Sequence, residues 1–213
     1  MATSPYPVQL SVDYPDRQLN RLTSALRIFT AIPILILLGA LAGSNGSTTW
    51  TNSDHTTTRS VGGGIGLLFL APLLMIVFRQ KYPRWWYDWN VNVLAFANRV
   101  GAYCLLLTDV YPATDEEQSV HLVVPYPDAK EGLNRWLPLV KWLLAIPHYI
   151  LLFFLWIGVI VAVIVAWFAI LFTGRLPRGL FDYVVGVGRW ANRVIAYALI
   201  LTTDEYPPFR LSP

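Results

Sequence analysis

Apolar residues in the first half of the chain fall into two long runs separated by a polar stretch. Residues 26–42 and 61–78 are almost entirely apolar, and the stretch 44–60 between them is rich in Ser, Thr, Gly and Asn. A helix needs about 17–25 apolar residues to cross the hydrocarbon core of a bilayer. The pattern therefore predicts a transmembrane helical hairpin with arms at about 26–42 and 61–78.

The second half contains one uninterrupted apolar run, residues 142–172. As a single helix this run would be roughly 45 Å long, which exceeds the hydrocarbon core of about 30 Å. Basic residues flank both of its ends, and the positive-inside rule places such ends in the cytoplasm. We therefore predict a second hairpin, with arms at about 139–156 and 159–173 and a fold near Gly158.

Short motifs recur in the same order in both halves of the chain. The matching pairs are residues 8–16 with 120–128, 19–21 with 133–135, 31–33 with 145–147, 97–99 with 191–193, and 107–112 with 201–207, and Arg27 is matched by Lys141. Self-similarity of this kind predicts tandem structural repeats. We therefore predict two modules, residues 1–112 and 113–213, which differ mainly by the polar stretch inside the first hairpin.

Each module begins with a partly alternating segment, residues 8–12 and 120–124, which predicts a short strand. The two strands could pair with each other on the cytoplasmic face. Each hairpin is followed by a mostly apolar helix with a narrow polar stripe, at about 85–107 and 180–201. Such a helix suits the headgroup layer, or a third crossing whose stripe faces protein. We favour the interfacial placement, because both helices begin beside basic residues at the cytoplasmic side.

Composition agrees with lipid as the solvent. Of the 213 residues, 55% are hydrophobic and 14% are charged, whereas soluble domains carry about 25% charged residues. The predicted fold class is mainly α and integral membrane. It has two tandem repeats, each with a short strand, a transmembrane helical hairpin and an amphipathic interfacial helix. We expect a multi-pass protein with both termini in the cytoplasm.

One set of polar residues is retained in both modules and forms the candidate contact site. The set comprises Asn98, Arg99 and Asp109 in the first module and Asn192, Arg193 and Asp204 in the second, with Arg189 on the same helical stripe. Arginine binds phosphate by bidentate hydrogen bonds, so the set could hold a lipid headgroup or a partner. Alternatively, each arginine pairs with a nearby acid and pins its helix to the closing segment of its module, which we favour.

Glycines spaced four residues apart predict close helix packing in the first hairpin. They are Gly39 and Gly43 in one arm, and Gly62 and Gly66 in the other. Small residues at this spacing allow helix backbones to approach closely in lipid. We favour packing within the hairpin over homodimerisation.

The sequence predicts no catalytic, metal-binding or cofactor-binding residues, and hence no enzyme. It contains no Gly-rich phosphate loop, nucleophile elbow or zinc-binding helix. His55, His121 and His148 lie far apart in the predicted topology, and Cys104 is the single cysteine. For His148 we favour a hydrogen-bonded or interfacial role over that of a ligand or proton carrier.

The second module resembles a known bacterial family. The resemblance rests on residues 142–148 (WLLAIPH), 167–175 (WFAILFTGR), 177–182 (PRGLFD) and 204–209 (DEYPPF). These residues are similar to the membrane family catalogued as "domain of unknown function 4389", and the first module looks like a degenerate copy. The resemblance implies a bacterial, notably actinobacterial, plasma-membrane location and brings no established activity.

These features predict a non-catalytic accessory or scaffold subunit of a larger membrane assembly. Its expected partners are membrane lipids and other membrane-protein subunits, with no nucleic acid. The alternative is a lipid-binding or small-solute transport module that uses Arg99 and Arg193 at the cytoplasmic interface. A membrane enzyme would require the retained Asp and Arg residues to converge at one depth.

Overall fold

A computed structural model describes residues 6–15, 19–42, 46–52, 55–61, 70–114, 116 and 118–213 of the chain. The helices are α1 (Arg21–Ala25), α2 (Arg27–Ala42), α4 (Arg84–Cys104), α5 (Pro138–Leu144), α6 (Ile146–Thr173) and α7 (Arg178–Ile195), with π-helical turns η1 (Met75–Arg79) and η2 (Ala196–Ile200). The strands are β1 (Gln9–Val12), β2 (Gly46–Asn52), β3 (His55–Val61) and β4 (Val120–Val123). The described part of the chain is therefore mainly helical, as predicted.

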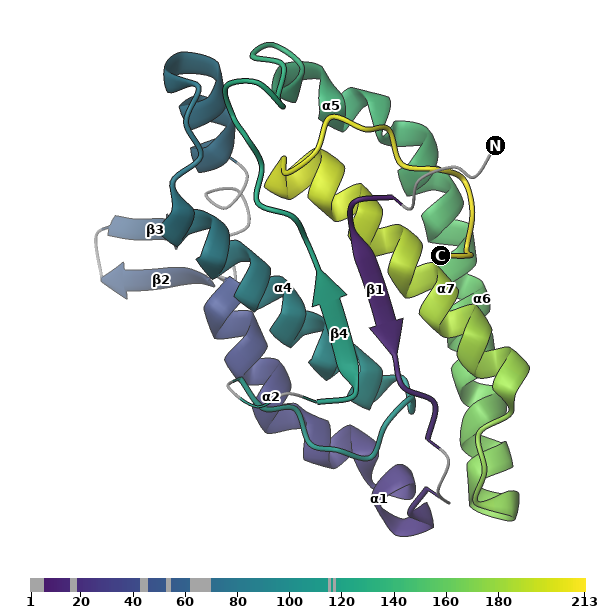
Figure 1. Ribbon diagram of the computed structural model, residues 1–213. Coiled ribbons are helices and arrows are strands. Elements are labelled where there is room, and N and C mark those ends of the chain that lie inside the picture. The colour runs from purple at the N-terminus through teal and green to yellow at the C-terminus, as the bar shows by residue number, and fades with distance from the viewer. Residues whose placement is uncertain are drawn as a thin grey trace, which may run out of the picture.

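The helices and strands form three layers (Figure 1). Strand β1 pairs with β4 in antiparallel fashion, with Leu10 opposite Leu122, which confirms the predicted pairing. Strand β1 packs on α7, and β4 packs on α4. On the other side of these two helices, α2 packs on α4 and α6 packs on α7. Residues from both predicted modules thus contribute to one hydrophobic core.

The apolar run of the second half is one continuous helix, α6, of 28 residues. The predicted hairpin with arms at 139–156 and 159–173 is therefore wrong. Gly158 does not turn the chain but allows a close helix contact, because a Cβ atom there would overlap the hydroxyl group of Tyr183 on α7. That hydroxyl donates a hydrogen bond of 3.0 Å to the carbonyl of Leu155. A glycine without a neighbouring proline leaves the helical hydrogen bonds intact, so nothing local stops the helix.

The first half has two separate apolar helical segments, α2 and residues 70–79. Figure 1 shows these segments at opposite ends of one side of the molecule, whereas α6 runs along the whole of the other side. The polar stretch between them contains the antiparallel hairpin β2–β3, which was not predicted from the sequence. A Cβ atom at Gly39 would meet no atom within 4 Å, so the described residues show no close packing there. Gly43, Gly62 and Gly66 lie outside the described residues.

The segments predicted at 85–107 and 180–201 are helices α4 and α7, the latter continued by η2. Asp109 follows Tyr103 by six positions, whereas Asp204 follows its counterpart Tyr197 by seven. The π-helical turn η2 lies in this interval and accommodates the extra residue.

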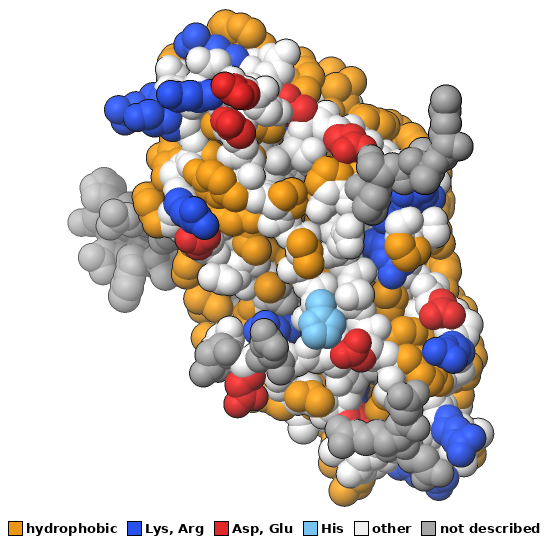
Figure 2. All heavy atoms as spheres, viewed as in Figure 1, with side chains coloured by type: hydrophobic (Ala, Val, Ile, Leu, Met, Phe, Trp, Pro, Cys, Tyr) orange, Lys and Arg blue, Asp and Glu red, His pale blue; other side chains and the backbone are white. Residues whose placement is uncertain are grey.

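Helix α6 presents a broad apolar surface away from α7. Phe153, Phe154 and Phe172 are 64%, 63% and 78% exposed. Only 22% of the most apolar part of α6 is buried, so this is not the enclosed core helix of a soluble domain. Figure 2 shows charged side chains spread over the opposite, strand-bearing face, with hydrophobic side chains continuing around its edges. The molecule therefore has two chemically different faces.

Candidate functional site

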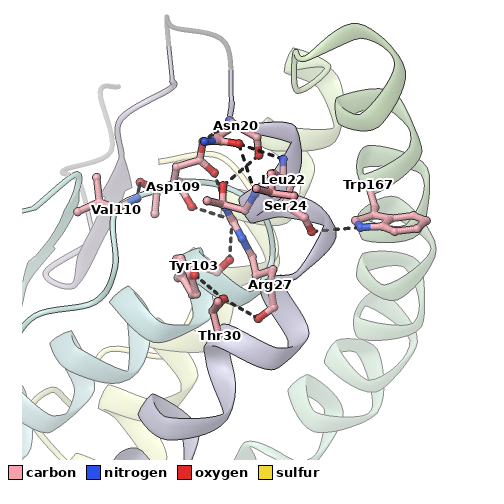
Figure 3. A network of polar contacts seen from close by, with 11 residues as sticks. Asn20, Leu22, Ser24, Arg27, Thr30, Tyr103, Asp109, Val110 and Trp167 are labelled. Carbon is pink, nitrogen blue, oxygen red and sulfur yellow. Dashed lines mark hydrogen bonds and ion pairs between the residues drawn. The ribbon is translucent and has the colours of Figure 1, made fainter.

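The first part of the candidate site is a buried ion pair between Arg27 and Asp109 (Figure 3). Arg27, at the start of α2, is 3% exposed. Its guanidinium group also donates to the carbonyls of Tyr103 and Thr108, at 2.9 and 2.8 Å, and lies 4.5 Å from the centre of the Tyr103 ring. Asn20 caps α1 and donates its backbone N–H to Asp109 at 2.7 Å. The cluster thus joins the start of α2 to the chain that leaves α4.

The second part is a buried ion pair at the aligned positions of the other half. The ammonium group of Lys141 is fully buried and lies 2.6 Å from Asp204. It donates to the carbonyl of Thr203 at 2.6 Å and lies 5.1 Å from the centre of the Tyr197 ring. The backbone N–H of Asn134 donates to Asp204, as that of Asn20 does to Asp109. Burial lowers the pKa of Lys141, and the carboxylate of Asp204 partly opposes this shift.

The retained arginines do not pair with these acids. Arg99 donates to the carbonyls of Ala113 and Thr114, at 2.9 and 3.3 Å. Arg193, which is 1% exposed, donates to those of Arg210 and Ser212, at 3.2 and 2.9 Å. Each arginine therefore attaches its helix to the segment that follows it, as predicted. It does so through backbone carbonyls, however, and not through the predicted aspartate. Burial is the main cause that lowers the pKa of Arg193.

Arg189 has a related but different role in holding the layers together. Its guanidinium group donates to the carbonyl of Leu10 on β1 at 3.1 Å and to that of Leu211 at 2.8 Å. The true partners of the acids, Arg27 and Lys141, were missed as site residues. The sequence contained the signal needed to find them, because the two basic residues occupy matching positions in the recurring motifs of the two halves.

Asn98 and Asn192 form a reciprocal pair of hydrogen bonds between α4 and α7. Each side-chain amide donates to the carbonyl oxygen of the other, at 2.8 and 2.7 Å. Each also donates its second hydrogen within its own helix, to the carbonyl of Leu94 or Gly188. The amide pair satisfies both side chains, of which Asn192 is buried and Asn98 is partly exposed, and it links the two central helices.

Replacing Asn98 by Ala is expected to lower the free energy of unfolding by about 1–2 kcal/mol, since it leaves the buried amide of Asn192 unpaired. The double replacement of Asn98 and Asn192 by Ala should cost little more than the single one. Equilibrium unfolding in detergent, analysed as a double-mutant cycle, measures this coupling. Asn92→Ala, at an exposed position of α4, is the matched control. Strict additivity of the two replacements would contradict the pairing.

His148 is fully buried and hydrogen-bonded, as expected from the sequence. Its Nδ1 accepts a hydrogen bond of 3.0 Å from the indole of Trp190, and its ring stacks on Phe209 at 4.2 Å. Nδ1 is therefore the acceptor, and the proton of a neutral ring lies on Nε2. Among the described residues, no group of three or more His, Cys, Asp or Glu side chains could hold a metal ion.

An apolar groove of about 540 Å³ lies between α2 and α6, beside the Arg27 cluster. It is lined by Ser24, Arg27, Ala31, Leu35, Cys104, Leu106, Val163, Ile164, Trp167 and Phe168. At one end, the indole N–H of Trp167 on α6 donates to the carbonyl of Ser24 on α1 at 3.2 Å (Figure 3). This contact joins α6 to α1, the short helix that precedes α2, at the polar end of the groove.

These features define a mainly helical protein in which, among the described helices, α6 alone is long and apolar enough to cross a membrane. Residues 136–210 match the model of the family described as Domain of unknown function (DUF4389). The match includes Lys141, Arg193 and Asp204, and it supports the resemblance for the second half of the chain only. No curated protein and no solved structure matches the chain.

Proposed function

We propose that this protein is a non-catalytic accessory or scaffold subunit of a larger assembly in the bacterial plasma membrane. The observation that carries the proposal is the exposed apolar surface of α6, with Phe153, Phe154 and Phe172 each more than half exposed. Contiguous apolar surface of this kind marks contact with lipid or with another protein. Membrane lipids and other membrane-protein subunits are therefore the proposed partners.

The layered fold favours an in-plane position of α6 over a perpendicular crossing. Figure 1 shows β1, β4, α7 and α6 extending in similar directions. A perpendicular α6 would therefore carry the two-stranded sheet to hydrocarbon depth, with its outer edges unpaired and the hydrogen-bonded side chains of Asp13 and His121 exposed. Open sheet edges do not occur in lipid. We propose that α6 lies within one leaflet, with the strand face and both chain ends in the cytoplasm, in place of the predicted multi-pass arrangement.

The matched contacts support the proposal that the chain is a tandem duplication. The two ion pairs use aligned positions, as described above. In addition, the hydroxyl of Tyr14 donates to the carbonyl of Leu176, and that of Tyr126 donates to the carbonyl of Tyr82. Each of these bonds crosses from one proposed module to the other at aligned positions. We therefore propose that the two modules pack against each other through equivalent contacts, as an internal pseudo-dimer.

The alternative function, headgroup binding or transport through Arg99 and Arg193, has less support. The guanidinium groups of both residues already donate to backbone carbonyls, and Arg193 is almost fully buried. A phosphate could bind there only if those bonds were broken. Arg99 and Arg193 are therefore poorly suited to hold a lipid headgroup.

A photo-crosslinking amino acid in place of Phe153 tests the scaffold role in native membranes. We expect it to form one discrete protein adduct of reproducible mass, because this side chain is exposed on the apolar surface of α6. The matched control is Val123, which is 59% exposed on β4 at the strand face, and which should not form that adduct. Lipid adducts alone at Phe153, together with a single-chain mass after mild detergent extraction, would contradict the scaffold role.

A further inference from the structure

The groove between α2 and α6 has the dimensions and the lining of a ligand site. Its volume of about 540 Å³ lies within the usual range of roughly 300–1,000 Å³ for small-molecule sites. Leu35 and Ile164 form opposite walls and are 47% and 51% exposed, so the groove is open along its apolar length. Such sites are mostly apolar with a few polar groups that fix orientation.

The polar end of this groove offers hydrogen-bond donors without net charge. Ser24 is 1% exposed, and neither its hydroxyl group nor Nε of Arg27 has a hydrogen-bond partner among the described residues. The charge of Arg27 is balanced by Asp109. A neutral acceptor, such as the carbonyl oxygen of an acyl ester, therefore suits this end better than a free carboxylate.

Exposed positive charge lies just beyond the polar end. The backbone N–H of Leu19 donates to the carbonyl of Gly174 at 3.0 Å, which holds the start of α1 against the end of α6. Arg21 lies two positions after Leu19, and Arg175 directly follows Gly174. Both arginines are exposed. Neither makes an ion pair with any residue in the described part of the chain. Arginines at the membrane surface attract anionic lipid headgroups.

We infer that this groove binds one anionic phospholipid of the surrounding membrane. An acyl chain lies along the apolar walls, its ester carbonyl accepts from the Ser24 end, and the phosphate lies between Arg21 and Arg175. Trp167 stands at the boundary of the two regions, where its indole N–H donates to the carbonyl of Ser24. The inference rests on the membrane placement proposed above and is independent of the scaffold role.

The test uses the full chain, purified in mild detergent and stripped of lipid. It is titrated with phosphatidylglycerol or with phosphatidylcholine of the same acyl chains, and bound lipid is counted by native mass spectrometry. Ile164→Trp fills the groove and should weaken phosphatidylglycerol binding by about tenfold or more. Excluding even two methylene groups of the acyl chain from the apolar walls lowers the affinity by about this factor. Leu35→Trp fills it from the other wall with the same expected loss. Ile160→Trp, 59% exposed on α6 but outside the groove, should bind as the unaltered protein does.

A second pair of variants tests the headgroup contact. The double variant Arg21→Gln and Arg175→Gln should bind phosphatidylglycerol no better than phosphatidylcholine, whereas Lys81→Gln and Lys130→Gln, at exposed sites elsewhere, should keep the preference. Equal loss of binding in Ile164→Trp and Ile160→Trp would overturn the assignment of the groove. Equal affinity of the unaltered protein for the two lipids would overturn the anionic headgroup. A bound protein helix that excludes lipid from the groove would also overturn the inference.

Discussion

Replacing Asp204 by Asn is expected to lower the free energy of unfolding by about 3 kcal/mol, because removing one partner of a buried ion pair leaves the other charge uncompensated. The charge left behind is that of Lys141, whose side chain is fully buried. Asn still offers an oxygen to the backbone N–H of Asn134, so the expected loss comes mainly from the missing charge. Equilibrium unfolding in detergent, followed by circular dichroism, measures it.

Two further variants show whether the effect belongs to the ion pair. Asp182→Asn removes an exposed acid of α7 and should change the free energy of unfolding by less than about 0.5 kcal/mol. Adding Lys141→Met to Asp204→Asn should recover part of the loss, because a buried methionine leaves no charge unpaired. If Asp204→Asn behaved like Asp182→Asn, the ion pair would contribute nothing to stability.

Replacing Gly158 by Val is expected to cost about 1–3 kcal/mol of stability, the usual effect of forcing extra atoms into a packed contact. The added side chain would overlap the hydroxyl and ring of Tyr183, and α6 could not remain as close to α7. The hydrogen bond from Tyr183 to the carbonyl of Leu155 would be lost as well. Thermal unfolding of the purified variant in detergent measures the change.

The Tyr183→Phe background shows whether the contact is the cause. Gly158→Ala should cost clearly less there than in the unaltered protein, since the phenylalanine ring lacks the overlapping hydroxyl group. Gly179→Ala on α7 is the matched control, because a Cβ atom at that position meets no atom within 4 Å. A cost of Gly158→Ala that did not depend on residue 183 would indicate that the two helices do not touch there.

Local pattern alone was enough to predict α2, α4 and α7 and the pairing of β1 with β4. The narrow polar stripe on a mostly apolar segment located α4 and α7, and the partly alternating segments 8–12 and 120–124 located β1 and β4. It also located the retained polar positions, including Asn98 and Asn192, which proved to contact each other. These predictions succeeded because helix and strand periods reflect which side of each element is buried.

The sequence by itself determined that the chain is rich in apolar helix, where β1 and β4 lie, and which polar positions both halves share. The tertiary structure alone decided that α6 continues through Gly158, because hydropathy reports the environment of a segment and not the path of its backbone. It also decided that Asp109 and Asp204 pair with Arg27 and Lys141 while Arg99 and Arg193 bind backbone carbonyls. Residue spacing along the chain cannot choose between such partners, since a hydrogen bond depends on distance and direction in the folded molecule.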